Sequence, residues 1–132
     1  MARSGSRIAS CIAAVCVAAL AIGAMAACDE MGNTYRPVAD ATPDSGKALI
    51  VHYGCGACHV IPGIGSASGV VGPPLTAFGR RTYIAGEVPN NVENLVAWLE
   101  NPQAIEASTA MPNLGVTAGD ARNMAAYLYT LH

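Results

Sequence analysis

Two cysteines and a histidine within five residues form the strongest chemical signal in the sequence. Cys55 and Cys58 are separated by two residues, and His59 follows directly. A Cys-x-x-Cys-His segment is typical of a c-type haem attachment site, because two thiols on one helical turn can each reach a vinyl group of the same haem. The histidine is then carried under the iron. The segment therefore predicts one covalently bound haem c, with His59 as an axial ligand.

Other uses of a Cys-x-x-Cys pair remain open on the sequence alone. A thioredoxin-like redox pair requires a strand and helix around it, and no convincing strand is predicted. A zinc site needs four ligands, for which only His52 and His132 remain. A bare disulfide between Cys55 and Cys58 is the third alternative. The adjoining His59 and the export signal at the N-terminus favour haem over all three.

The sixth position on the iron decides what a haem does, because methionine or a second histidine there favours electron transfer and an open position favours ligand binding or catalysis. Met111 precedes Pro112 in a loop between two predicted helices, from which it can face the side of the haem opposite His59. We therefore predict His59 and Met111 as metal ligands. The other candidates for the sixth ligand are less suitably placed. Met31 lies in the linker, Met124 and His52 on predicted helices, and His132 at the chain end.

One helix is expected before the Cys-x-x-Cys-His segment and another after the glycine-rich residues 61–75. The first is capped by Asp44 or Ser45 and ends where the cysteine pair begins. The second covers residues 92–101, with Asn90 and Glu93 as its capping box. Its apolar face consists of Leu95, Trp98 and Leu99.

A third helix begins at Thr117, with Asp120 three residues later as a capping box, and carries a clear apolar stripe. Residues 61–75 are predicted as a glycine-rich loop that wraps closely around a flat group. No strand precedes this loop and no P-loop lysine follows it, which argues against a phosphate site. The predicted fold is all-α, with a few helices wrapped around one haem.

The N-terminus has the features of bacterial export. Residues 1–27 contain a basic start, an uncharged apolar run and small residues at its end, which is typical of a signal peptide. Met25-Ala26-Ala27-Cys28 resembles a lipobox, so we expect cleavage before Cys28 and its lipidation. A permanent transmembrane helix and ordinary cleavage with a free Cys28 are the alternatives.

The predicted organisation is a signal peptide over 1–27, a lipid-anchored flexible linker over 28–43 and the haem domain over 44–132. From Cys28 onward the chain has five Lys or Arg residues and nine Asp or Glu residues. Nucleic-acid binding requires basic patches, so we expect no nucleic-acid partner.

These motifs occur in the order typical of one family, and residues 44–132 resemble the class I cytochromes c of mitochondria and bacteria. Gly72-Pro73-Pro74-Leu75 resembles the family's Gly-Pro-x-Leu loop. In that family the proline carbonyl accepts a hydrogen bond from the ligating histidine, so the resemblance gives this role to Pro73. Such a bond orients the ring and tunes the metal. The all-α cytochrome c fold is implied as well.

Further cofactor contacts follow from the same resemblance. Phe78-Gly79-Arg80-Arg81 is similar to a segment whose arginine approaches a haem propionate, which indicates Arg80. Trp98 resembles the aromatic residue beside the haem, and Thr109-Ala110-Met111-Pro112 resembles the methionine loop. A plain surface charge for Arg80 and a plain core position for Trp98 are the alternatives.

The resemblance implies one-electron transfer rather than enzymatic catalysis, with iron cycling between Fe(II) and Fe(III). With the lipid anchor, the expectation is a membrane-tethered carrier on the periplasmic side of the bacterial inner membrane. Its partners would be membrane respiratory complexes: a terminal oxidase, a quinol-oxidising complex or a dehydrogenase. The alternatives are a dedicated cytochrome c subunit of an oxidase or dehydrogenase, and a haem enzyme or gas sensor.

Overall fold

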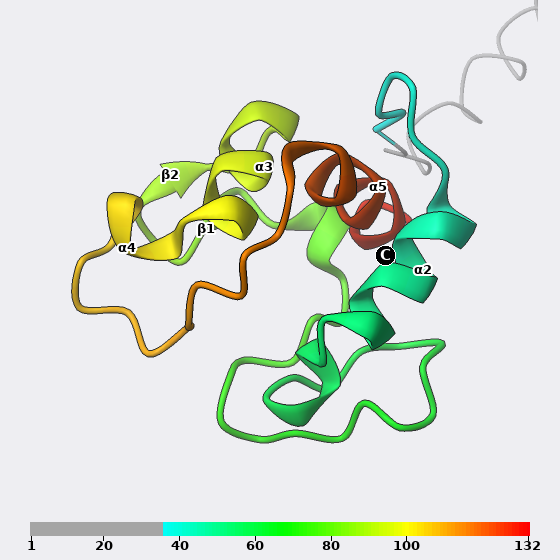
Figure 1. The fold of residues 1–132 in the computed structure, drawn as a ribbon, viewed down its shortest axis with the longest axis horizontal. Helices are drawn as coiled ribbons and strands as arrows, with labels where there is room; N and C mark the ends of the chain where they lie inside the picture. Colours follow the sequence, from blue (N-terminus) through cyan, green and yellow to red (C-terminus); the bar gives the residue numbers. More distant parts are fainter. Residues whose placement is uncertain (1–35) are drawn as a thin grey trace, which may run out of the picture. The chain divides into compact units, whose positions relative to one another are not determined.

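The computed structural model describes residues 36–132, so the predicted signal peptide, Cys28 and the first part of the predicted linker lie outside the described residues. No helix within the described range is long and apolar enough to cross a membrane. Figure 1 shows the helices of this range and a short hairpin. The elements in chain order are α2 (Pro43–His52), η1 (Cys55–Ala57), η2 (Phe78–Arg80), β1 (Tyr83–Ile84), β2 (Val88–Pro89), α3 (Val92–Glu100), α4 (Pro102–Ile105) and α5 (Ala118–Leu128).

Helices dominate the domain, and the all-α fold is confirmed. β1 and β2 form an antiparallel pair of two residues each, in which Ile84 lies opposite Val88. A single isolated bridge joins Val60 to Ser68 inside the glycine-rich loop. Among residues 36–132 there is no larger sheet.

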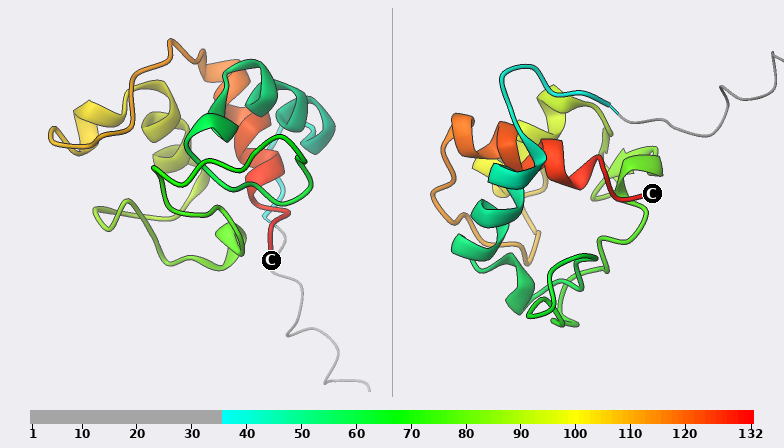
Figure 2. Two further views of the ribbon diagram at one scale, coloured as in Figure 1. Left: turned by 90° about the horizontal axis from the view of Figure 1, so that it is seen from below. Right: turned by 90° about the vertical axis from the view of Figure 1, so that its right-hand side faces the viewer.

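The crossing of α2 and α5 organises the domain, and Figures 1 and 2 show the two helices side by side. Gly46 permits this approach, because a Cβ there would lie 1.9 Å from the backbone oxygen of Asn123. The Thr42 amide donates to the Asn123 side chain at 2.9 Å. Further along, the Tyr53 hydroxyl donates to Asp120 at 2.7 Å. Hydrogen bonds therefore hold the two helices together on both sides of the close contact.

The N-cap of the first helix lies two residues before the earlier of the two predicted caps. Thr42, rather than Asp44 or Ser45, is the N-cap of α2, and its hydroxyl accepts from the Ser45 amide at 3.3 Å. Pro43 occupies the first helical position, where its missing N–H costs nothing and its fixed φ suits the helix. The prediction failed because Thr42, Asp44 and Ser45 are all good capping residues.

The cap of α3 also differs from the prediction. Asn91 is the N-cap and accepts from the Asn94 amide at 2.8 Å, so the predicted box of Asn90 with Glu93 is wrong. Asn90 is instead buried and accepts a hydrogen bond from the Tyr129 hydroxyl at 3.0 Å. The cap of α5 is confirmed, since the Thr117 hydroxyl accepts from the amide of Asp120.

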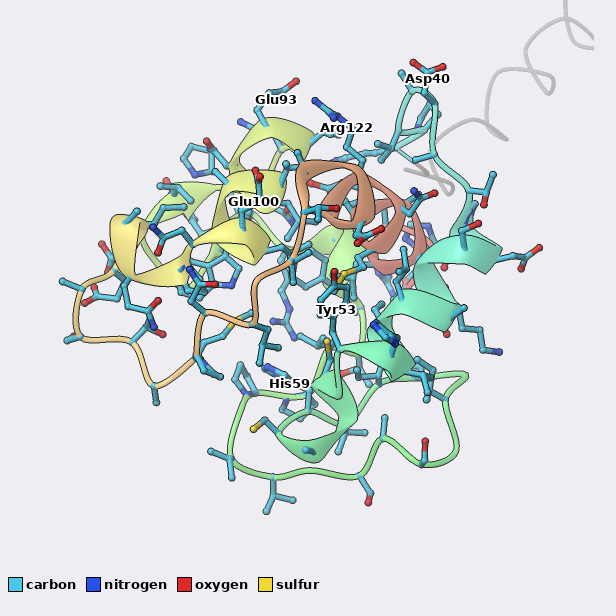
Figure 3. All side chains as sticks on the ribbon, viewed as in Figure 1. Asp40, Tyr53, His59, Glu93, Glu100 and Arg122 are labelled. Atoms are coloured by element: carbon cyan, nitrogen blue, oxygen red, sulfur yellow. The ribbon has the colours of Figure 1, made fainter. Side chains whose placement is uncertain are left out.

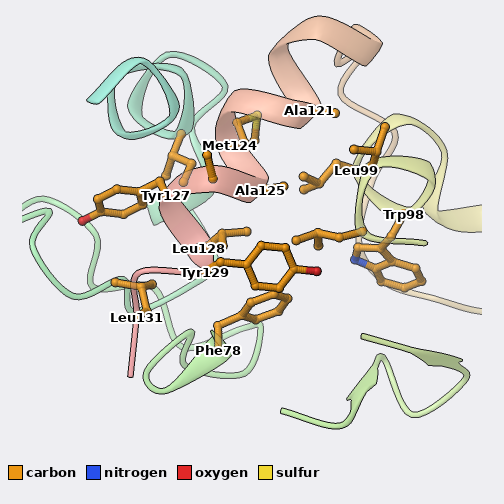
Figure 4. Packing of buried hydrophobic residues seen from close by; sticks show 14 of the residues in the cluster. Phe78, Trp98, Leu99, Ala121, Met124, Ala125, Tyr127, Leu128, Tyr129 and Leu131 are labelled. Carbon is orange, nitrogen blue, oxygen red and sulfur yellow. The ribbon is translucent and has the colours of Figure 1, made fainter. Parts of the chain in front are cut away.

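The core lies between α3 and α5 and extends to the aromatic side chains shown in Figure 4. Tyr129 is fully buried, and its ring centroid lies 6.2 Å from that of Phe78. Met124 is 1 % exposed, which makes it a core residue of α5. The predicted apolar face of α3 is confirmed, since its three members are all buried.

The packed domain begins before the predicted boundary. Val38 is buried, the Arg36 guanidinium donates to the backbone oxygen of Asn90, and it lies 5.4 Å from the Tyr129 ring centroid. Arg36 and Val38 therefore pack on the domain, within the segment that the sequence predicted as flexible linker. The contacts of Arg36 are made with Asn90 and Tyr129, far along the chain, so the local sequence pattern does not reveal them.

Candidate haem-attachment site

The two cysteines lie on one tight turn directly after α2. Gly54 adopts a left-handed conformation with φ of +71°, which ends the helix and turns the chain into η1. The Cys58 and His59 amides both donate to the Cys55 carbonyl, at 3.2 Å and 3.0 Å. This turn brings the two thiols and the imidazole together, as the attachment motif requires.

Both thiols are free and half-buried. Burial is the main cause that raises the pKa of the Cys55 thiol. No group of three or more His, Cys, Asp or Glu residues in the described part of the chain could hold a metal ion. The zinc alternative therefore lacks a ligand set there.

The His59 imidazole is oriented by the glycine-rich loop. Its Nδ1 lies 2.7 Å from the Pro73 carbonyl oxygen. Because a carbonyl only accepts, Nδ1 must carry the hydrogen, and Nε2 is left with the free lone pair that a metal needs. Gly72 makes the approach possible, since a Cβ there would lie 2.3 Å from His59 Cε1. Figure 3 shows His59 beside the turn that carries the cysteines.

Backbone hydrogen bonds hold the loop against the attachment turn. The Gly72 amide donates to the Cys58 carbonyl at 2.8 Å, and the Leu75 amide donates to the Val60 carbonyl at 2.8 Å. The hydrogen bond that the family resemblance implies for Pro73 is thus present in the structure. Ligation of iron by His59 stays a prediction.

Met111 is half-buried and packs against the hydrophobic core. Its amide donates to the Thr109 hydroxyl at 3.2 Å, and its carbonyl accepts from the Gln103 side chain at 2.6 Å. Sequence reasoning missed Gln103, because nothing in the pattern marks a side chain that bonds a backbone oxygen eight residues away. A hydrogen bond from α4 therefore holds the Met111 loop. Ligation of iron by the Met111 side chain stays a prediction.

The same loop contains a turn built on a carboxylate. The hydroxyl and the amide of Ser108 donate to Glu106 at 2.6 Å and 2.8 Å. These bonds stabilise the charged form and lower the pKa of Glu106. The turn begins the segment that leads from α4 to Met111.

The structure separates the two neighbouring arginines. Arg80 is exposed, whereas the Arg81 guanidinium lies 5.4 Å from the Phe78 ring centroid and donates to the carbonyls of Pro74 and Thr76. Arg81 is thus the arginine that reaches the loop carrying Pro73. Sequence reasoning missed this, because adjacent arginines cannot be distinguished by pattern. The propionate contact predicted for Arg80 stays a prediction.

Trp98 lies on the buried face of α3 and is 8 % exposed. Figure 4 shows its indole at the edge of the core, on the α3 side. This placement agrees with a core position and is compatible with the predicted contact to a cofactor, which stays a prediction.

The residues present fit a covalently attached haem. Cys55 and Cys58 supply two free thiols on one turn, His59 keeps Nε2 available, and Met111 supplies a soft thioether from a second, anchored loop. Imidazole and thioether are the axial donors of cytochrome c haems, and the two thiols of a Cys-x-x-Cys-His segment attach the haem covalently. No buried side-chain polar atom among the described residues lacks a hydrogen bond.

Comparison with known proteins identifies the family of the domain. Residues 43–132 match the family model described as cytochrome c. The chain is also similar to cytochrome c oxidase subunit 2 of Alkalihalophilus pseudofirmus, with 36 % identity over 89 residues that cover 67 % of this chain and 25 % of that protein. The subunit 2 of Bacillus subtilis is 32 % identical over 103 residues, covering 76 % of this chain and 29 % of that protein. The chain thus spans only about a quarter of the length of these relatives.

Proposed function

This chain belongs to the cytochrome c family and carries covalently bound haem c, and from that premise we propose that it is a membrane-tethered one-electron carrier of a bacterial respiratory chain. The observation that carries the electron-transfer role is the family match over residues 43–132. When bound, the haem supplies a single Fe(II)/Fe(III) couple. The thiols of Cys55 and Cys58 would anchor it, and His59 Nε2 and Met111 Sδ would hold the iron.

The residues around these ligands favour a carrier over a catalyst. The Pro73 carbonyl holds the His59 ring in one orientation, and Gln103 together with Thr109 holds the backbone of Met111. Two ligands that are each positioned by the protein leave no open site for a substrate and limit rearrangement on redox change. Methionine ligation also raises the reduction potential relative to two nitrogen ligands, which suits electron delivery to an oxidase.

The relatives support a terminal oxidase as the electron acceptor, since both are cytochrome c oxidase subunits. A quinol-oxidising complex or a dehydrogenase would supply the electron. The same relatives favour a second candidate, a dedicated subunit of one oxidase, because in them the matching region is part of a much longer chain. Copurification distinguishes the two: a free carrier separates from the oxidase in detergent, and a subunit does not.

The tether is proposed at Cys28, on the periplasmic side of the inner membrane. The signal-like pattern of residues 1–27 and the lipobox-like segment support it. Several acyl chains would hold the protein firmly, at about 0.8 kcal/mol for each buried methylene. We expect Cys28→Ser to move the protein from the detergent phase to the aqueous phase in phase partitioning. Retention in the detergent phase would contradict the lipid anchor.

Absorption spectra of the purified protein, oxidised and then reduced, test the central proposal. We expect sharp c-type bands and a weak far-red band from methionine ligation. Met111→Leu should lose the far-red band and bind carbon monoxide when reduced, whereas the wild type should not bind it. Met124→Leu is the control, because this volume-conserving change in the core costs less than about 1.5 kcal/mol and should leave both spectra unchanged.

The possible results separate the hypotheses. Absence of haem bands would refute the cofactor assignment. A wild-type protein that binds carbon monoxide readily would favour a haem enzyme or gas sensor over an electron carrier. A far-red band that survives Met111→Leu would remove Met111 as the ligand.

A further inference from the structure

A long uncharged stretch surrounds the haem-attachment turn. No Asp, Glu, Lys or Arg stands between Lys47 and Arg80. In the fold this stretch forms the second half of α2, the turn η1 and the long loop that crosses the bottom of Figure 1. In the same view, Figure 3 shows charged residues in the upper half, away from that loop: Asp40, Glu93, Glu100 and Arg122.

Two apolar side chains project from this loop into solvent. Val70 is 88 % exposed and Val71 is 77 % exposed, more than any other large hydrophobic residue of the described chain. Single exposed apolar residues are common on protein surfaces. Two adjacent ones in a stretch without charged residues form an apolar patch, which is the kind of feature that marks an interaction site. One charge from outside the stretch reaches the same loop, the Arg81 guanidinium, and it is bonded to the carbonyls of Pro74 and Thr76.

The valine pair is held in place by the attachment turn itself. The Gly69 amide, just before the pair, donates to the Gly56 carbonyl at 3.0 Å. The Gly72 amide, just after it, donates to the Cys58 carbonyl at 2.8 Å. Both ends of the pair are therefore bonded to the segment that carries the haem thiols, so the valines present a fixed surface rather than a loose loop tip.

The uncharged surface continues around the turn. A shallow depression of about 280 Å³ lies between the end of α2, η1 and the start of the loop, and all of its lining residues are uncharged. Its lining includes Val51, which is 54 % exposed, and Gly56, which also bonds Gly69. The attachment turn therefore contacts both the depression and the valine pair.

We propose that Val70, Val71 and this adjoining uncharged surface are the docking face for a redox partner whose own docking face is apolar and uncharged. The inference rests on the electron-transfer function proposed above. Val71 directly precedes Gly72, which packs against the His59 ring, so a partner seated on the valines lies close to the iron ligand. A charged partner face would find no countercharge within the stretch, and the Arg81 guanidinium that reaches the loop is already bonded to the carbonyls of Pro74 and Thr76. The charges of such a partner would therefore be desolvated without compensation.

The size of the patch fits a transient redox encounter. Such complexes have small interfaces, below about 1,200 Å² in total. A stable dimer of this chain needs more contact area than two valines and a shallow depression supply. A lipid surface attracts basic segments, and the stretch between Lys47 and Arg80 contains none.

The test uses the reduced holoprotein and membranes that contain the terminal oxidase of the producing organism, with the bimolecular oxidation rate as readout. For the wild type we expect less than about a twofold change in rate when the salt concentration is raised tenfold, whereas electrostatically steered association falls steeply with ionic strength. Val70→Lys combined with Val71→Lys should lower the rate by about tenfold or more, because two charges would be desolvated in the interface.

The matched control is Ala97→Lys, at an exposed position on α3, which should stay within about twofold of the wild-type rate. The reduction potential and the far-red band should be unchanged in all of these variants, which shows that the valine changes act on docking and not on the haem site. Ferricyanide, a small anionic oxidant that needs no docking face, should oxidise every variant at a similar rate at high salt, where the added lysine charges are screened.

A double variant that transfers electrons at the wild-type rate, or a wild-type rate that falls steeply with salt, would overturn the docking face and leave the carrier function intact. If ferricyanide oxidises the wild-type protein but the oxidase-containing membranes do not, both the docking face and the proposed carrier function are refuted. Two other results would overturn the proposal. If the wild type dimerises in sedimentation and the two lysines abolish the dimer, the valines bind a second copy of the chain. If the wild type binds phosphatidylcholine vesicles and the lysines abolish that binding, the valines bind lipid.

Discussion

An alanine at position 72 should push the His59 imidazole away from Pro73. The added Cβ would lie 2.3 Å from Cε1, 2.7 Å from Nδ1 and 2.8 Å from Nε2 of the ring. All three distances are shorter than real Cβ contacts. The ring is also tied to the Pro73 carbonyl through Nδ1 at 2.7 Å, so it cannot move without lengthening that hydrogen bond.

The expected size of the effect follows from these contacts. Overpacking of this kind costs about 1–3 kcal/mol, and the lost hydrogen bond about 1 kcal/mol, so the free energy of unfolding should fall by about 2–4 kcal/mol. A hydrogen bond at Nδ1 makes the imidazole a stronger donor to the metal, which favours the oxidised iron. Its loss should therefore raise the reduction potential, by up to about 40 mV if the whole 1 kcal/mol is specific to that state.

Potentiometric titration of the holoprotein measures the shift in potential, and urea unfolding measures the stability. Gly65→Ala is the matched control, because Gly65 lies in the same loop and a Cβ there would meet nothing within 4 Å. If Gly72→Ala behaves like Gly65→Ala in both assays, the close contact between Gly72 and the His59 ring does not position the ligand, and the reasoning is refuted.

Two further predictions concern the crossing of α2 and α5. Gly46→Ala should lower the free energy of unfolding by about 3 kcal/mol, because the new Cβ would lie 1.9 Å from the Asn123 backbone oxygen. Gly119→Ala is the control, since its Cβ would meet nothing within 4 Å, and it should raise the free energy of unfolding by up to about 1 kcal/mol. Equal urea midpoints for the two variants would contradict this prediction. The hydrogen bond to Asp120 is the main cause that raises the pKa of Tyr53, so the stability from this contact is complete below about pH 10 and is lost as pH rises through the raised pKa. Melting temperatures measured from about pH 9 to 11 should decline less in Tyr53→Phe than in the wild type, and equal slopes would argue against the linkage.

The local chemistry of the site could be predicted because its spacing is dictated by covalent geometry. Two thiols that reach one haem must lie on one turn, so Cys55, Cys58 and His59 are recognisable without any coordinates. The cap of α5 was equally accessible, since Thr117 and Asp120 interact within one helical turn.

The failed predictions share a different cause. Asn90 and Asn91 are both good capping residues, and the choice between them was made by Tyr129, which lies 39 positions away and takes Asn90 into the core. The placement of Arg81 on the loop, at the carbonyls of Pro74 and Thr76, is a separate finding that two adjacent arginines do not reveal in a sequence, and the propionate contact of Arg80 stays a prediction.

The sequence by itself determined the attachment motif, the family, the helical class and the loops that carry His59 and Met111, because each depends on residue types at short, fixed spacing. Only the tertiary structure decided that Arg36 packs on the domain, that Gln103 holds the Met111 loop and that Val70 and Val71 stay in solvent. Those outcomes depend on which distant segments meet. Burial and hydrogen bonding are settled by the whole packed domain rather than by any local stretch.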